Sequence, residues 1–112
     1  MKFAVPVTNG ILATHFGHCE HFALIDVDEG SKAIVRKKIV PSPGHQPGLL
    51  PVWLVEEGVS TVIAGGMGSR AQALFIDNHI NVVVGVLGHD PEQLVVDYMG
   101  GTLATGDNVC DH

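Results

Sequence analysis

A strand, a glycine-rich turn and a helix start follow one another directly in residues 59–75, and this unit limits the fold more than any other stretch. Residues 61–64 are a short β-branched apolar run, which is typical of a parallel strand covered on both faces. Ser69, with Gln72 three residues later, matches a capping box and predicts that a helix begins there. A strand that leads through a short turn into a helix favours an α/β fold.

The turn itself is the first candidate for a binding site. Its glycines remove the side chains that would keep the backbone away from a ligand, and a helix N-terminus has a partial positive charge. Arg70 is poorly placed for the helix dipole, so we expect it to serve an anion, although a solvated surface arginine is the plain alternative. Met67 is a soft ligand or, more simply, a gap-filling side chain. The residues predicted to bind an anionic ligand are Gly65, Gly66, Met67, Gly68, Ser69 and Arg70.

The rest of the chain predicts a mixed five-stranded sheet with three helices. The first strand is followed by a hairpin and then by two strand–helix units, so the second strand runs antiparallel to the other four. Loops that follow the four parallel strands then share one edge of the sheet, which is the usual place for a ligand in open α/β sheets. We expect strands at residues 2–7, 22–27, 32–40, 61–64 and 81–86, and helices at residues 49–57, 69–78 and 91–100.

Histidines and cysteines are concentrated in the loops of this edge. Four potential ligands fall within seven positions, and imidazole with thiolate suits zinc, copper, iron or a metal–sulfur cluster. The alternative is a solvated loop in which Cys19 is a small buried residue. His79 precedes the last strand and is expected at the opposite end. The candidate metal ligands are His15, His18, Cys19 and His21, with His45 and His89 from neighbouring loops and Cys110 and His112 from the tail.

Composition narrows the classes of function. A formal charge of −6 argues against nucleic-acid binding, which needs a basic face. Apolar residues after Lys2 stop at Val7, and no apolar run is long enough for a membrane span, so we expect a cytoplasmic protein with reduced cysteines. The length of 112 residues predicts one domain, residues 1–112, with a mobile tail at residues 106–112.

Several short segments together resemble one known family. They are His15-Phe16-Gly17, the segment VIAGGMGSRA at residues 62–71, Gly85 in a buried strand, and the ending Gly106-Asp107-Asn108-x-Cys110-x-His112. The chain resembles the dinitrogenase iron–molybdenum cofactor biosynthesis family, which includes NifX, NafY and the C-terminal part of NifB.

The resemblance implies a ribonuclease-H-like fold without nuclease activity and with strand order 3-2-1-4-5. It also implies binding or carriage of an anionic metal–sulfur cluster of the iron–molybdenum or molybdenum–copper type, and a ligand role for His15.

We therefore expect a non-enzymatic carrier that receives a cluster or its precursor, works with a donor or acceptor protein, and is a monomer or a weak dimer. One alternative is a zinc- or copper-binding module that uses the histidines. A second is a small nucleotide-binding regulatory domain, because Gly66-x-Gly68-x-x-Ala71 satisfies the dinucleotide pattern.

Overall fold

The structure of the chain, a computed structural model, describes residues 1–44 and 48–106, and of His18 it describes only the backbone. Strands and helices alternate after an opening pair of hairpins. The elements are, in chain order, β1 (Lys2–Thr8), β2 (Ile11–Leu12), the 3-10 helix η1 (Phe16–His18), β3 (His21–Val27), β4 (Ile34–Pro41), α1 (Leu49–Glu56), β5 (Thr61–Ile63), α2 (Ser69–Asp77), β6 (Asn81–Val83) and α3 (Pro91–Gly100).

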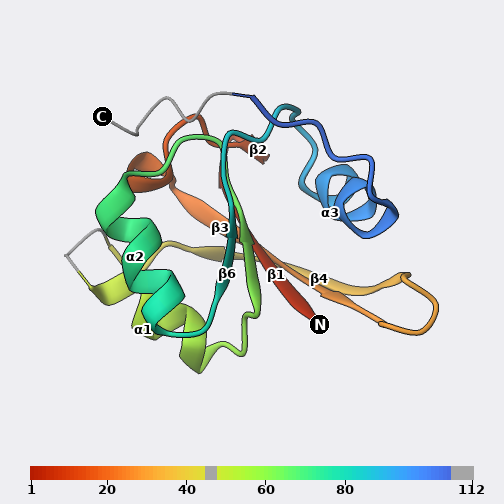
Figure 1. Cartoon of the computed structure of the whole chain (residues 1–112), viewed down its shortest axis with the longest axis horizontal. Helices are drawn as coiled ribbons and strands as arrows, with labels where there is room; N and C mark the ends of the chain where they lie inside the picture. Colours follow the sequence, from red (N-terminus) through yellow and green to blue (C-terminus); the bar gives the residue numbers. More distant parts are fainter. Residues whose placement is uncertain (45–47, 107–112) are drawn as a thin grey trace.

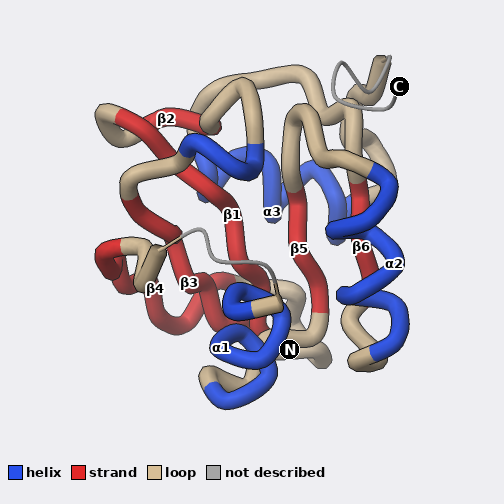
Figure 2. Tube along the Cα trace, turned by 90° about the vertical axis from the view of Figure 1, so that its left-hand side faces the viewer, coloured by secondary structure: helices blue, strands red, loops and turns tan. Residues whose placement is uncertain are grey.

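One mixed sheet of six strands forms the centre of the molecule, in the order β4-β3-β1-β5-β6, with β2 paired to the end of β1 (Figure 2). The pairs β1–β3 and β3–β4 are antiparallel, and the pairs β1–β5 and β5–β6 are parallel. These are the strand directions expected from the sequence. The expectation of five strands is wrong, because Asn9 (φ 55°) and Gly10 (φ 81°) form a tight turn that folds Ile11–Leu12 back onto β1.

Helices cover both faces of the sheet (Figure 1). On one face, Leu50 and Leu54 of α1 and Phe75 of α2 join a core cluster with alternate residues of β1, β3 and β5. On the other face, Leu94 and Val95 of α3 join the remaining alternate residues. Because β1 lies between both layers, its side chains from Phe3 to Val7 are buried on either side, and this strand fixes the position of the loop that leaves its carboxyl end.

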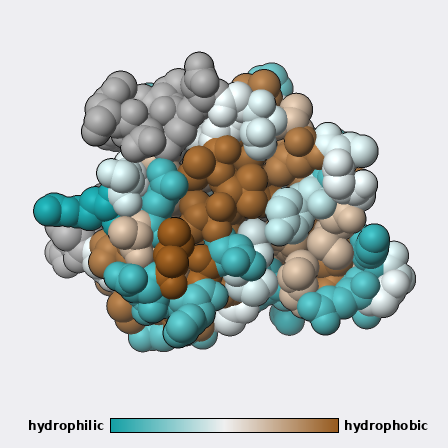
Figure 3. Space-filling model, viewed as in Figure 1, coloured by the Kyte–Doolittle hydropathy of each residue, from teal (hydrophilic) through white to brown (hydrophobic). Residues whose placement is uncertain are grey.

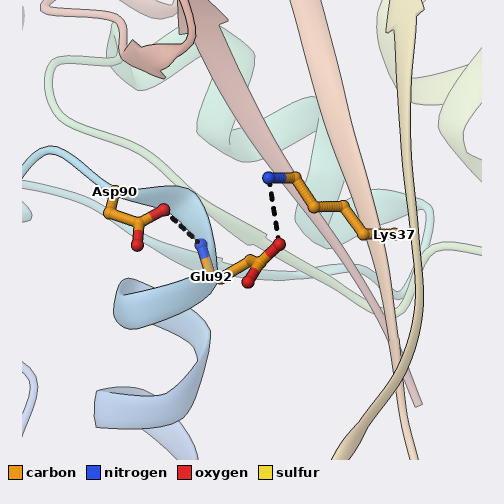
Figure 4. A network of polar contacts seen from close by, with 3 residues as sticks. All are labelled: Lys37, Asp90 and Glu92. Atoms are coloured by element: carbon orange, nitrogen blue, oxygen red, sulfur yellow. Dashed lines mark hydrogen bonds and ion pairs between the residues drawn. The ribbon is translucent and has the colours of Figure 1, made fainter.

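The two edges of the sheet differ in character. The exposed residues of β4 include Arg36, Lys37 and Lys38, which discourage pairing with another chain. Lys37 also forms an ion pair of 3.0 Å with Glu92 at the start of α3, where Asp90 caps the helix (Figure 4). By contrast, an apolar area lies over β6 between α2 and α3 (Figure 3), where the residues of β6 carry no charge.

Two predicted strands differ from the structure by more than one residue at one end. Lys32 adopts φ 61° in the turn after β3, so β4 begins only at Ile34. The last strand ends at Val83 rather than at residue 86, because Gly85 has φ 70° and turns the chain. Within the described residues, no helix has the length and apolar character needed to cross a membrane.

Candidate functional site

The loops that follow β1, β5 and β6 are joined by backbone hydrogen bonds at one edge of the sheet. Phe16 N–H donates to the carbonyl oxygen of Gly66 over 2.7 Å, and Gly66 N–H donates to Thr14 over 2.8 Å. On the other side of the glycine turn, Gly85 N–H donates to Gly65 over 2.7 Å. The glycine turn therefore lies between the two other loops and holds both. The edge predicted from chain direction exists.

A groove of about 530 Å³ opens where these loops meet. It lies at the topological switch point of the sheet, where the chain leaves β1 towards β3 on one side and β5 towards β6 on the other. Leu12 N–H donates to the carbonyl oxygen of His89 over 2.8 Å, which ties together two walls of the groove. We call it the edge groove; its lining is Ile11, Leu12, Ala13, Thr14, Gly65, Gly66, Gly85, Val86, Leu87, Gly88 and His89.

Gly65 is required by close packing and not by an unusual backbone angle. A Cβ at this position would lie 3.1 Å from the carbonyl oxygen of Thr14 and 3.2 Å from that of Ala13. The carbonyl of Thr14 is itself held by Gly66 N–H and has little freedom to move. A side chain at Gly65 would therefore push the β1 loop away from the glycine turn.

The helix start after the turn is built differently from the predicted capping box. Gly68 occupies the N-cap position of α2, Ser69 is the first helical residue, and no side chain caps the first turn. Gln72 Nε2 instead donates to the carbonyl oxygen of Met67 over 2.9 Å. Gly68 has the extended backbone of an N-cap residue (φ −65°, ψ 153°) but no side chain that could accept a hydrogen bond. The helix therefore begins where expected, but Ser69 is not its cap.

The six residues predicted as one anion site are divided by the structure. Gly65 and Gly66 line the edge groove, and Met67 is buried in the core with 1% exposure. Gly68 and Arg70 line a second hollow of about 330 Å³ on the side of α1 and α2. We call this the apolar hollow; its lining is Phe16, Gly17, Gly48, Leu50, Pro51, Gly68, Arg70, Ala71, Leu74 and Phe75.

The described histidines of this edge lie in separate places along it. His89 lines the edge groove, whereas exposed His15 lines an adjoining hollow that shares the segment Ile11 to Thr14 with the groove. His21 begins β3 and lines a third hollow beside Ile39 of β4. His79, with φ 62° after α2, lies at the far end of the sheet as expected. The side chain of His18, and the predicted ligands His45, Cys110 and His112, lie outside the described residues.

Cys19 belongs to the core and not to the surface of the edge. It is 2% exposed and packs in the same cluster as Phe16 and Phe22. Burial raises the pKa of its thiol from 9.0 to about 11, so the thiol is protonated at neutral pH. Since a metal binds the thiolate, this burial disfavours Cys19 as a ligand, and its predicted role rests on the sequence alone.

The described residues do not contain three histidine, cysteine, aspartate or glutamate side chains close enough to hold one metal ion together. His89 and His15 instead line two adjoining hollows that share the segment Ile11 to Thr14.

Sequence reasoning missed part of the groove. Gly85 and the segment Ile11 to Thr14 were not expected to line it. A glycine inside the apolar run NVVVGV is the one sequence feature that could have indicated a turn or a close approach at Gly85.

Known proteins share this sequence pattern and this fold. The family model described as dinitrogenase iron-molybdenum cofactor matches residues 1–101. An uncharacterized protein of Methanocaldococcus jannaschii is 31% identical over 87 residues, which are 73% of this chain and 72% of that protein. The crystal structure of a protein designated PH0822 has a TM-score of 0.84 and 27% identity, with 94% of each chain covered. The apo form of the orange protein from Desulfovibrio gigas has a TM-score of 0.68 and 20% identity, with 96% of this chain and 93% of that chain covered. Because the family model matches residues 1–101, about nine-tenths of this chain, the chain belongs to the dinitrogenase iron–molybdenum cofactor family.

Proposed function

We propose that this protein binds and carries an anionic metal–sulfur cluster, or a precursor of one, in the edge groove. The observation that carries the proposal is the groove itself, which lies at the switch point of the sheet, has glycine walls and has a histidine on either side of the segment Ile11 to Thr14. The description of the family, which refers to the iron–molybdenum cofactor, supports a cargo of this kind.

The electrostatics of the site favour neutral donors for such a cargo. The chain has a formal charge of −6, so overall attraction does not bring an anion to it. Imidazole nitrogens bind a metal atom without adding negative charge, and glycines leave room for a bulky group to come close to the backbone. We assign metal contacts to His15 and His89, and the closest backbone approach to Gly65, Gly66 and Gly85.

The proposal includes carriage without chemical conversion and exchange of the cluster with a donor or acceptor protein. We also interpret the strand order β4-β3-β1-β5-β6 as the ribonuclease-H-like arrangement that the family resemblance implies. The edge groove opens at the surface of the molecule, which is what transfer of a cargo to another protein requires.

Anaerobic reconstitution with iron, molybdate and sulfide, followed by metal and acid-labile sulfide analysis, tests the proposal. Bound metal with stoichiometric sulfide is the expected result. Metal without sulfide would replace the proposal with a simple metal-binding module, and nucleotide retained without metal would replace it with a nucleotide-binding domain.

A matched pair of histidine variants tests the location. His15→Asn should weaken cluster binding about tenfold or more, because it removes a metal ligand at the groove. His79→Asn is the control at the far end of the sheet, and asparagine is chosen because it tolerates the left-handed backbone at φ 62°. Anaerobic titration followed by cluster absorbance gives both affinities, and equal losses in the two variants would exclude the edge groove as the site.

A further inference from the structure

The apolar hollow has the features of a binding site for an organic molecule. It lies between η1, the start of α1 and α2, and aromatic rings form part of its wall, since Phe16 and Phe75 meet edge to face at 5.4 Å. Phe75 is fully buried, Phe16 is 5% exposed and Leu50 is 6% exposed, so the wall is part of the packed core. Its volume of about 330 Å³ is within the range of small-molecule sites.

Among the described residues of this lining, Arg70 is the one with a charged side chain. Arg70 is exposed in the first turn of α2, and within the described part of the chain no carboxylate forms an ion pair with it. A guanidinium group presents parallel N–H donors that match a carboxylate in two hydrogen bonds. An apolar cavity with a single cation selects a ligand that has an apolar body and an anionic head.

The apolar hollow is separate from the edge groove. The two share no lining residue among residues 1–44 and 48–106, and a backbone hydrogen bond joins Phe16 of the hollow to Gly66 of the groove. A ligand in the hollow therefore does not need a cluster in the groove.

We propose that the apolar hollow binds a small organic acid, whose apolar body lies against Phe16, Leu74 and Phe75 and whose carboxylate is received by Arg70. This inference is independent of the proposed cluster binding. The site adds a second, organic ligand to a protein whose family name refers only to a metal cofactor.

Titration of the metal-free protein with octanoate, followed by NMR of the methyl groups of Leu50 and Leu74, tests the proposal. Saturable binding with shifts at these methyl groups is expected, and affinity should rise about threefold to fourfold per methylene from butyrate to octanoate. Octanol has the same body without the charge and should bind at least about fivefold more weakly than octanoate.

Two arginine variants with equal loss of charge separate a specific head-group contact from general attraction. Arg70→Gln should weaken octanoate binding at least about fivefold and leave octanol binding unchanged. Arg36→Gln, on exposed β4, should change neither affinity by more than about twofold. The proposal is overturned if octanoate fails to saturate, if octanol binds as tightly as octanoate, if the two variants behave alike, or if the shifts lie elsewhere. If octanol binds tightly and its affinity does not change in Arg70→Gln, the hollow instead receives an apolar side chain of a protein partner.

Discussion

The buried thiol of Cys19 makes the stability of this protein depend on alkaline pH in a way that can be measured. The pKa of Cys19 is about 11 in the folded protein and 9.0 as the ordinary value, which we take for the unfolded chain. Above pH 9 the unfolded chain therefore loses this proton first, and the folded state is favoured less as the pH rises towards 11. At about 1.4 kcal/mol per pH unit, the free energy of unfolding should fall by about 2 kcal/mol between pH 7.5 and pH 10.5 from this group alone.

Urea unfolding of two proteins at both pH values isolates this contribution. The parent carries Cys110→Ser, so that Cys19 is the one thiol left, and the second protein carries Cys19→Ala in addition. Titration of lysine and tyrosine affects both proteins equally and cancels in the comparison. The parent should lose about 2 kcal/mol more than the Cys19→Ala protein on going to pH 10.5. If both lose the same amount within about 0.5 kcal/mol, the thiol is not held in the apolar core that the structure gives it.

Two further substitutions test the edge groove and the helix beside it. Gly65→Ala should destabilise the protein by about 1–2 kcal/mol, because its Cβ would meet the carbonyl oxygen of Thr14 at 3.1 Å, whereas Gly17→Ala, whose Cβ meets nothing within 4 Å, should change stability by less than about 0.5 kcal/mol. Chemical denaturation measures both, and a neutral Gly65→Ala would show that the loop of β1 yields easily. Asp90→Ala should lower stability by about 0.5–1 kcal/mol, since the carboxylate of Asp90 accepts a 3.3 Å hydrogen bond from the N–H of the second helical residue and caps α3. An unchanged melting temperature for this variant would mean that the cap adds nothing.

The positions and directions of the main strands could be reasoned from the sequence because apolar runs and turn residues mark them, whereas the strand order came from the family resemblance. The run Thr61 to Ala64, the hairpin turn after Val27 and the Pro91 helix start each carry a local physical preference, and the structure has an element at each. The two-residue strand β2 could not be found in this way, because Ile11 and Leu12 are too few to show a period.

The edge of the sheet that holds the candidate site could be predicted from the sequence, but the positions of its individual side chains could not. Chain direction alone brings the loops of His15, Gly65 and His89 to one edge, and this follows from sheet topology. Spacing in the sequence cannot reveal that Cys19 turns into the core while His15 stays exposed, since that depends on how η1 packs against Phe22 and Phe75. In the same way, spacing in the sequence does not reveal that Gly65 lines the edge groove while Arg70 lines the apolar hollow.

The segment after α3 adds an outer layer of backbone hydrogen bonds to the loop after β6, which lines the edge groove. Residues 104–106 return to the loop after β6, where Leu87 N–H donates to Ala104 over 3.0 Å and Gly106 N–H donates to Gly85 over 2.6 Å. The donors of these outer bonds, Leu87 and Gly106, are exposed, so the bonds should open by local fraying, whereas the inner bond from the buried Gly85 to Gly65 should open only with the sheet. Amide hydrogen exchange should therefore be fast at Leu87 and Gly106 and slow at Gly85. The contacts between the segment after α3 and the loop after β6 can thus break without disturbing the bond that holds this loop to the glycine turn.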